Sequence, residues 1–549
     1  MPILGTQSSR SGGTPTAPTS VSATAGTAQA TVTFTASSYI GKGSVTYTAI
    51  SSPGNITATG TSPITVTGLT NGTAYTFTVR ATSSTGETAT SSASLSTTPV
   101  APDFMARLSY TYDMTSININ TDSSGNIYTV GHRYGSDSSQ KYGYVTKHSA
   151  DGALIWQKQI AHYASGPNRR TNSSKAVWVD SSLNVYIAAT EMPINENYNY
   201  NHSLITKLDS SGNLVWQKLY NGPTDGGGTP QQFNLYSLDA DSSNNLYFSG
   251  GMTDTGTQDQ DYCLTKISSA GTHAWTYYYA FSGDQGSGNY FTAMDTDSSG
   301  NSHCIGHYPT QTLISKGNYV YHSTWNTVKI NNSGTITWAR KFYDYSKNHY
   351  VYDVAIDSSE NVHSIGSSNQ NGTYQFHVAK HNSSGSLQWQ RRIYDASSSA
   401  AGYRLAVDSS GNVYGVGGES NTSPYAVMII KWDSSGTVQW QRRFIASSQS
   451  PSVNDVTVSG TSLIITGNYT NGSINNAYLI KVPLDGSKTG TYTVGGLSYV
   501  YSTASYTETS GSMTDASESL TQSSARSITT NTGDSTIEAG LLSVATTSI

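Results

Sequence analysis

The chain has 549 residues and a low charge density, because Lys, Arg, Asp and Glu make up 11% of it, against ~25% in an average soluble domain. It contains 39 Tyr and 52 Gly residues, a composition that favours an all-β protein with neutral polar surfaces. The net charge of −5 supplies no basic field, so nucleic acid is not an expected partner, since phosphate binding needs clustered Lys and Arg.

Residues 1–16 are rich in Gly, Ser and Thr and carry no core pattern, so we expect a flexible N-terminal arm. They contain no charged leader followed by an apolar run, and a secretory signal is therefore not expected. No stretch of eighteen apolar residues occurs along the sequence, so no membrane span is expected either.

Residues 17–99 show alternating Thr and Val after Ala17 and Pro18, which predicts a β-sandwich. The segment from Gly68 to Ala81 resembles the E–F region of fibronectin type III domains. The resemblance implies a tyrosine corner, in which the Tyr75 hydroxyl bonds back to the backbone. Phe34 stands where that family usually has a Trp. We interpret this fibronectin type III-like domain as a spacer module.

A motif of Lys, four residues, Gly, three residues and Trp recurs along residues 105–487. Its copies begin at Lys147, Lys207, Lys266, Lys329, Lys380 and Lys431, and a seventh copy at Lys481 keeps the Gly but lacks the Trp. Successive Lys residues lie 60, 59, 63, 51, 51 and 50 positions apart. A period near 50 residues is typical of propellers and solenoids.

Most repeats also carry a turn sequence, Asp-Ser-Ser-x-Asn, between two short alternating runs. The turn Asp residues are Asp122, Asp180, Asp241, Asp297, Asp357 and Asp408. Two strands joined by such a turn make a hairpin, and the Lys-to-Trp half makes a second hairpin through a turn that contains Gly. Four antiparallel strands per repeat, without helical periodicity, predict a seven-bladed β-propeller.

The seventh repeat supplies only three strands, and residues 106–112, just before the first repeat, look like its missing fourth strand. We therefore expect this N-terminal strand to close the ring non-covalently, which removes exposed sheet edges. The region resembles the bacterial and phage family of seven-bladed propeller repeats, whose blades carry Asp-x-x-Gly-Asn-Val-Tyr and Gly-x-x-x-Trp hairpins. That resemblance implies the fold and leaves the activity open.

Residues 488–549 are mostly Ser and Thr and contain few apolar residues. Such a segment lacks the means to build a core of its own. We expect it to be disordered or to become ordered against a partner, as a Ser/Thr-rich C-terminal tail used for anchoring or oligomerisation.

Antiparallel blades place their connections alternately at two rims. The regular turns share one rim, whereas the connections after the second and fourth strands share the other rim and vary in length. The variable connections are rich in Tyr, which suits carbohydrate or protein surfaces. Loop-to-loop packing of these Tyr side chains is the alternative. The candidate ligand-binding residues are Tyr198, Tyr200, Tyr278, Tyr308, Tyr319 and Tyr345.

Several other residues are interpreted as structural. The repeated Lys residues are expected to pair with the turn Asp residues. Cys263 and Cys304 fall inside repeats and are expected to be small buried apolar residues. His303 occupies a repeat position held elsewhere by Tyr, and it lies ~13 Å along a strand from His307, too far to share a metal ion. No metal site and no cofactor are predicted.

Two groups of carboxylates could support other chemistry. Asp254, Asp259 and Asp261 lack the spacing of an EF-hand, so calcium binding in that loop is left open. Glu191 and Glu196 are the pair on the variable rim that a glycosidase could use. The sequence contains no nucleophile elbow, phosphate loop or metalloprotease motif, and no catalytic residue is predicted.

These features favour a non-enzymatic virion structural protein of a tailed phage, such as a tail fibre, appendage or decoration, that attaches to a host-surface glycan or receptor. The order of domains resembles that of marine phage structural proteins. Virions assemble in the host cytoplasm without a signal peptide yet face outward. Other virion proteins are expected partners through the arm or the tail, and a homo-oligomer is left open. The alternatives are a bacterial surface adhesin or glycan-binding protein and a polysaccharide-degrading enzyme.

Overall fold

The protein is described by a computed structural model that divides into two compact units, Met1–Pro102 and Asp103–Ile549. The structure describes residues 13–548 except 42, 72, 100–102, 110–112, 136–140, 163–170, 193–200, 223–231, 254–259, 282–289, 316–317, 344–346, 371–372, 395–398, 421–424, 447–448, 472–473, 495–496, 511–512, 518–519, 523–528, 533–534 and 540–542. In some strands, including 308–322 and most of the strands after 516, only the backbone is described.

The first unit is a fibronectin type III-like sandwich of two antiparallel sheets. One sheet has the order β1 (Thr19–Gly26), β2 (Gln29–Thr35), β5 (Ile64–Thr67), and the other the order β4 (Thr57–Gly60), β3 (Val45–Ser52), β6 (Thr76–Ser83), β7 (Thr88–Thr90). The alternating sequence of β2 and β6 directs every second side chain inward.

The core of this unit contains Phe34 against Tyr47, with ring centroids 5.0 Å apart, and the buried Tyr75. The Tyr75 hydroxyl accepts a hydrogen bond from the Thr70 backbone N–H at 3.1 Å. The expected tyrosine corner is therefore confirmed.

The described part of the second unit contains seven antiparallel sheets, here numbered in chain order. Sheet 1 is β9 (Met114–Thr121), β10 (Ile127–Tyr134), β11 (Lys141–His148), β12 (Leu154–His162); sheet 2 is β13 (Thr171–Val179), β14 (Val185–Met192), β15 (His202–Leu208), β16 (Leu214–Asn221); sheet 3 is β17 (Gln232–Ala240), β18 (Leu246–Thr253), β19 (Gln260–Ile267), β20 (His273–Phe281); sheet 4 is β21 (Tyr290–Thr296), β22 (Ser302–Ser315), β23 (Asn318–Ile330), β24 (Ile336–Tyr343). Sheet 5 is β25 (His349–Ile356), β26 (Val362–Gln370), β27 (Thr373–His381), β28 (Leu387–Tyr394); sheet 6 is β29 (Ala400–Val407), β30 (Val413–Glu419), β31 (Ala426–Trp432), β32 (Val438–Ala446); sheet 7 is β33 (Ser452–Ser459), β34 (Ser462–Asn471), β35 (Ile474–Pro483), β8 (Phe104–Ser109).

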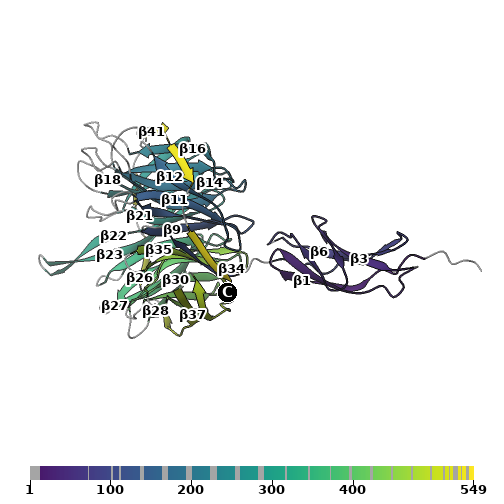
Figure 1. The fold of residues 1–549 in the computed structure, drawn as a ribbon. Coiled ribbons are helices and arrows are strands. Elements are labelled where there is room, and N and C mark those ends of the chain that lie inside the picture. The colour runs from purple at the N-terminus through teal and green to yellow at the C-terminus, as the bar shows by residue number, and fades with distance from the viewer. Residues whose placement is uncertain are drawn as a thin grey trace, which may run out of the picture. The chain divides into compact units, whose positions relative to one another are not determined.

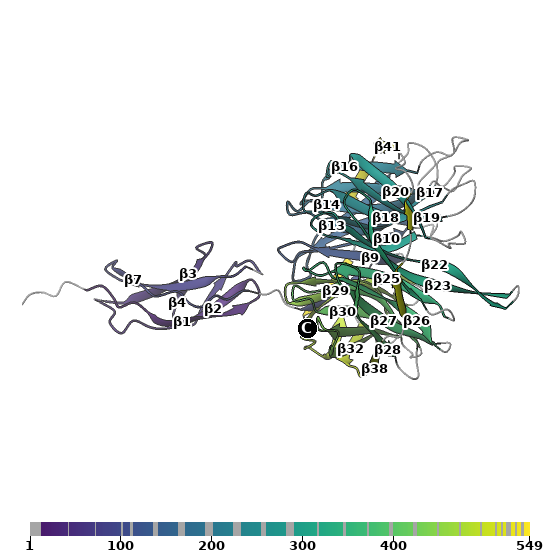
Figure 2. The ribbon, with the colours of Figure 1, turned by 180° about the vertical axis from the view of Figure 1, so that it is seen from behind.

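The first strands of these sheets contact one another in a closed ring, in which β33 of sheet 7 returns to β9 of sheet 1. The long β22–β23 hairpin projects beyond its neighbours (Figures 1 and 2). The arrangement is consistent with the blades of a β-propeller. Strand β8 pairs with β35, which confirms that a strand from before the first repeat completes the last sheet. It spans Phe104–Ser109 and so begins two residues before the predicted strand of 106–112, of which 110–112 lie outside the described residues.

The C-terminal segment differs from the expected separate tail. Its first strands, β36 (Gly490–Val494) and β37 (Leu497–Thr503), form a hairpin that adds two strands to sheet 6. The segment then runs around the second unit and adds one outer strand to each of sheets 5, 4, 3, 2, 1 and 7, in that order. We call residues 497–548 the C-terminal belt. Its later strands are β38 (Thr507–Ser510), β39 (Thr514–Ser517), β40 (Leu520–Gln522), β41 (Thr529–Thr532), β42 (Ser535–Ala539) and β43 (Ser543–Ser548).

The physical reason for the belt is the open edge of each sheet. A fourth strand such as β28 would present a row of unpaired backbone N–H and C=O groups, and β38 pairs with that row from Arg391↔Ser510 to Tyr394↔Thr507. Backbone pairing needs no apolar sequence, so a Ser/Thr-rich segment can supply it. The partner that orders this segment is thus the chain's own set of sheets.

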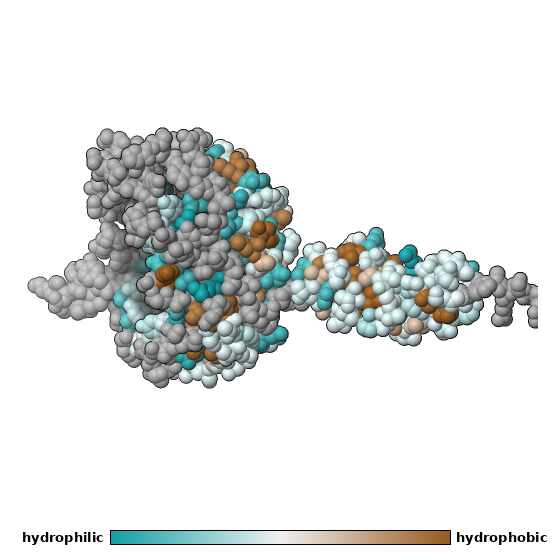
Figure 3. Space-filling view, in the orientation of Figure 1, coloured by the Kyte–Doolittle hydropathy of each residue, from teal (hydrophilic) through white to brown (hydrophobic). Residues whose placement is uncertain are grey.

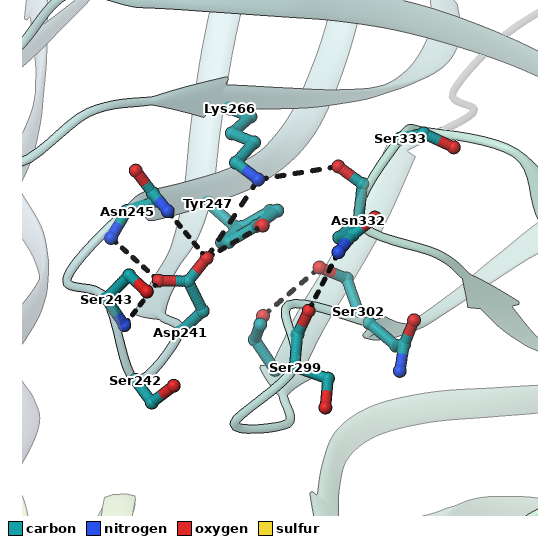
Figure 4. A network of polar contacts seen from close by, with 12 residues as sticks. Asp241, Ser242, Ser243, Asn245, Tyr247, Lys266, Ser299, Ser302, Asn332 and Ser333 are labelled. Atoms are coloured by element: carbon teal, nitrogen blue, oxygen red, sulfur yellow. Dashed lines mark hydrogen bonds and ion pairs between the residues drawn. The ribbon is translucent and has the colours of Figure 1, made fainter.

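Each turn Asp organises a polar network, which Figure 4 shows for Asp241. Its carboxylate accepts hydrogen bonds from the backbone N–H groups of Ser243 and Asn245, from the Asn245 side-chain amide and from the Tyr247 hydroxyl, at 2.8–3.1 Å. Lys266 Nζ lies 3.9 Å from the same carboxylate and over the Tyr247 ring. The expected pairing of repeat Lys with turn Asp is confirmed at Lys147, Lys266 and Lys380, whereas Lys329 pairs with Glu360.

The Gly and Trp of the motif hold neighbouring sheets together. The indole N–H of Trp338 donates to the Ser383 carbonyl in the next sheet at 3.0 Å. Gly385 of that same turn has φ 80°, and a Cβ there would lie 2.8 Å from Trp338 Cδ2. Only Gly suits both the left-handed backbone and the close approach. The motif spacing therefore reflects a contact between sheets.

The visible described surface in Figure 3 is mostly white and teal, with hydrophobic residues in small separate patches. This agrees with the neutral polar composition of the chain. Within the described ranges there is no helix with the length and hydrophobicity needed to cross a membrane.

Candidate functional site

The structure separates the six Tyr residues predicted to bind a ligand. Tyr198, Tyr200 and Tyr345 lie outside the described residues. Tyr308 and Tyr319 belong to the extended β22–β23 hairpin, not to a loop, and their side chains are not described. The prediction that Tyr278 lies in an exposed connection is wrong. Tyr278 lies within β20 and is 3% exposed, and its hydroxyl donates a hydrogen bond to Met252 Sδ at 2.8 Å. Tyr278 is therefore a core residue.

The other candidates are mainly structural. Cys263 and Cys304 are free and buried, as expected. His303 is fully buried, and so is His363, whose Nε2 lies 3.2 Å from Asp357 Oδ2. Glu191 is buried in β14, while Glu196, Asp254 and Asp259 lie outside the described residues. Among the described side chains, no group of three His, Cys, Asp or Glu is arranged to hold a metal ion.

A β-bulge interrupts the first strand of every sheet at one equivalent position. The bulged residues are Ile117, Lys175, Tyr236, Thr292, Tyr352, Tyr403 and Asn454. A bulge redirects its side chain out of the regular ladder and is common beside functional sites. Here it places seven different residues around the inner wall of a repetitive scaffold.

Three of these bulged residues belong to a continuous series of rings, which we call the aromatic arc. It consists of Tyr236, Tyr290, His307, Tyr350, Tyr352, Tyr374 and Tyr403, from sheets 3 to 6. Ring centroids of contacting members lie 4.8–6.5 Å apart, with Tyr374 against Tyr350 and Tyr403 against Tyr352, within the usual range for aromatic pairs. All seven side chains are half-buried, so each ring keeps one exposed part.

The arc borders a groove of about 610 Å³ between sheets 5, 6 and 7. Tyr350, Tyr352, Tyr374, Tyr403 and Tyr425 line it, near the beginnings of the first and third strands. This is the rim at which the sequence analysis expects the variable connections. The volume falls within the ~300–1,000 Å³ range of small-molecule sites.

The phenol groups of the groove remain uncharged near neutral pH. Burial raises the pKa of Tyr350, Tyr352 and Tyr403 above the usual phenol value, so these hydroxyls stay protonated. Burial also lowers the pKa of the arc residue His307. The groove can therefore offer phenol hydroxyls and flat apolar faces to a ligand.

A second cavity of about 380 Å³ lies inside the ring of first strands. Its four Asp side chains each accept a backbone N–H bond from the first strand of the next sheet: Asp239 from Thr296, Asp295 from Ile356, Asp353 from Leu405 and Asp455 from Ile119, at 2.6–2.9 Å. Burial raises the pKa of Asp239 and Asp353 to about 6 and that of Asp455 to about 7. These carboxyls join neighbouring sheets, which accounts for their position without a catalytic role.

Sequence reasoning missed the residues of the groove. Tyr352 and Tyr403 each stand five positions before a turn Asp, and the same position holds Ile117 and Lys175 in sheets 1 and 2. The sequence does contain one indication of the groove: the position five residues before each turn Asp keeps its spacing from repeat to repeat but varies in residue type. This variation indicates a binding surface only once the β-bulge at that position is known, and the bulge is visible only in the strand register.

No protein-family model matches the chain, and no curated protein matches it. Among solved structures it is similar to the exotype rhamnogalacturonan lyase YesX, at 10% identity and a TM-score of 0.24 over 89% of this chain and 90% of the lyase. It is also similar to the FN1–FN3 domains of chicken CNTN1, at 11% identity and a TM-score of 0.15 over 68% of this chain and 95% of that one. Neither similarity assigns a family or an activity.

Proposed function

We propose that the chain is a non-enzymatic structural protein of a tailed-phage virion, in which a seven-bladed β-propeller attaches the particle to a glycan or receptor on the host surface. The blades are sheets 1 to 7, and the fibronectin type III-like unit is a spacer. Residues 1–16 connect it to other virion proteins.

The observation that carries this proposal is the groove bordered by the aromatic arc. Half-buried Tyr rings gather at the variable rim of sheets 3 to 6, whereas the other rim repeats the same Asp turns. A scaffold with one rim of repeated turns and an aromatic surface at the other rim is suited to display and contact.

Two further features fit a particle that assembles in a cytoplasm and then faces the exterior. Cys263 and Cys304 are free and buried, so the described fold is closed without a disulfide and needs no oxidising compartment. The C-terminal belt covers the outer edges of all seven sheets, which protects them from pairing with other chains.

Immunogold electron microscopy with antibodies against the purified chain tests this assignment. Particles and cells from the source culture are separated by density and labelled in parallel. We expect label on the particles. Label confined to the cell envelope would contradict the virion assignment and favour the surface adhesin.

A further inference from the structure

The side chains that line the groove at sheets 5 to 7 restrict the class of ligand that it can bind. Among the described residues that line it, Glu419 is the one charged side chain. Glu419 is 4% exposed, and its Oε2 lies 3.3 Å from Arg443 Nε and accepts a hydrogen bond from the Tyr506 hydroxyl at 3.2 Å. The negative charge is thus compensated within the protein, and the wall presents no net charge to a ligand.

The Tyr rings of the groove adopt two orientations. Tyr350 and Tyr352 stack with an angle of 22° between their planes, while Tyr403 stands against Tyr352 at 66°. The groove is therefore lined by Tyr rings in two clearly different orientations. Ser hydroxyls complete the lining. Flat apolar faces beside fixed hydroxyl groups complement a ligand with one apolar face and a polar edge.

The rim of the groove carries a further ring that does not belong to the core. Tyr425 is 51% exposed and precedes β31. An exposed Tyr at the edge of an aromatic pocket can cover a bound ring with little change in the fold, because it loses few torsional degrees of freedom on binding.

We propose that this groove binds an uncharged pyranose unit of a glycan, with the sugar's C–H face against the Tyr rings and its hydroxyl groups on the phenol and Ser hydroxyls. The inference rests on the proposed attachment function and specifies its ligand class. Anionic sugars such as uronates are excluded, because the described lining of the groove offers no uncompensated cation to a carboxylate.

Saturation-transfer NMR and calorimetry on the full chain test the inference with maltose, cellobiose and lactose as neutral probes and digalacturonate as the acidic probe. We expect at least one neutral disaccharide to bind, with an affinity that does not change between low and high salt. Tyr425→Ala should weaken that binding about three- to tenfold, the range that one aromatic contact accounts for, and Tyr425→Phe should retain it.

The matched control is Tyr39→Ala, since Tyr39 is 50% exposed but belongs to the first unit; this variant should bind as the unmodified chain does. Binding of digalacturonate as tight as that of the neutral sugars would overturn the inference. So would the absence of neutral-sugar binding, or unchanged affinity in Tyr425→Ala. Absence of the chain from virions, with neutral-sugar binding intact, would instead contradict only the proposed function.

Discussion

Phe104 lies opposite Lys481 across β8 and β35, the register in which Trp156 lies opposite Lys147 in sheet 1. Its ring also lies against Gly152 of sheet 1, where a Cβ would be 2.7 Å away. The seventh motif, which lacks its Trp, is thus completed by a Phe from the strand that precedes the first repeat.

Phe104→Ala should therefore weaken the closure between sheets 7 and 1. Phe104 is 1% exposed, and removing a buried aromatic ring costs about 3–5 kcal/mol of unfolding free energy. Urea unfolding followed by Trp fluorescence measures this loss, because all nine Trp residues lie in the second unit.

Ile155→Ala is the control for Phe104→Ala, since Ile155 of β12 is 51% exposed and its truncation should change stability by less than about 0.5 kcal/mol. Equal urea midpoints for Phe104→Ala and the unmodified chain would contradict the role of Phe104 in closing the ring.

Gly385→Ala separates backbone strain from contact between sheets. The substitution meets both a left-handed φ and the Trp338 indole, so a loss of about 2–4 kcal/mol is expected. Gly460→Ala is the matched variant, because Gly460 has φ 59° but nothing within 4 Å, and it should cost only about 1–2 kcal/mol. Similar losses in urea unfolding would show that the Gly–Trp contact contributes nothing.

Tyr499→Ala tests whether the C-terminal belt stabilises the sheets that it covers. Tyr499 is 3% exposed and stacks on Phe444 of sheet 6 at 5.6 Å with an angle of 6° between the rings. We expect its loss to lower the unfolding free energy by about 3–5 kcal/mol, measured by urea unfolding.

Thr493→Ala in the adjacent β36 is exposed and serves as the control for Tyr499→Ala. Removal of residues 488–549 should in addition speed limited proteolysis and promote self-association, because it uncovers all seven outer edges. A truncated chain that stays monomeric and resists protease as well as the full chain does would contradict a stabilising belt.

Asp455→Asn should change the pH dependence of stability. Burial, reinforced by the charge of Asp353, raises the pKa of Asp455 from 3.8 to about 7 in the folded state. The folded pKa exceeds the unfolded one, so the stabilisation from this carboxyl is complete below about pH 4 and is lost as the pH rises through 7. Relative to the unmodified chain, Asp455→Asn should gain roughly 4 kcal/mol between pH 4 and pH 8, measured by urea unfolding at several pH values.

Asp209→Asn should change the pH dependence of the unfolding free energy in the opposite sense. Backbone and side-chain hydrogen bonds from Asn213 lower the pKa of the exposed Asp209, so its stabilising contribution is present above the usual carboxyl pKa and is lost as the pH falls further. A difference between Asp455→Asn and the unmodified chain that does not vary with pH would contradict the raised pKa of Asp455.

Local patterns predicted the repeat units well, because their causes lie within a few residues. The bonds from Asn126 to Asp122 span four positions, and the bond from Thr70 to Tyr75 spans five, so the residue types alone indicate them. Tyr278 was misassigned because a run of Tyr residues suggested a loop, although the fourth strand of sheet 3 continues through it.

The groove and the belt could not be predicted, since both depend on distant parts of the chain. Tyr352 and Tyr403 lie 51 positions apart and meet only when sheets 5 and 6 pack side by side. The pairing of Phe342 with Asp515 joins backbones more than 170 positions apart, and backbone hydrogen bonding leaves no mark on side-chain sequence.

The reverse order of the C-terminal belt also sets a sequence of events for folding. The belt is synthesised after all seven sheets, and it pairs first with sheet 6, then with progressively earlier sheets down to sheet 1, and finally with sheet 7. Once β38 has paired with sheet 5, only three residues separate its end from β39, so each new strand closes a short loop at small entropic cost. We expect the belt strands to pair one after another around the ring, so that the edges of sheets 1 and 7 stay open longest on a newly made chain.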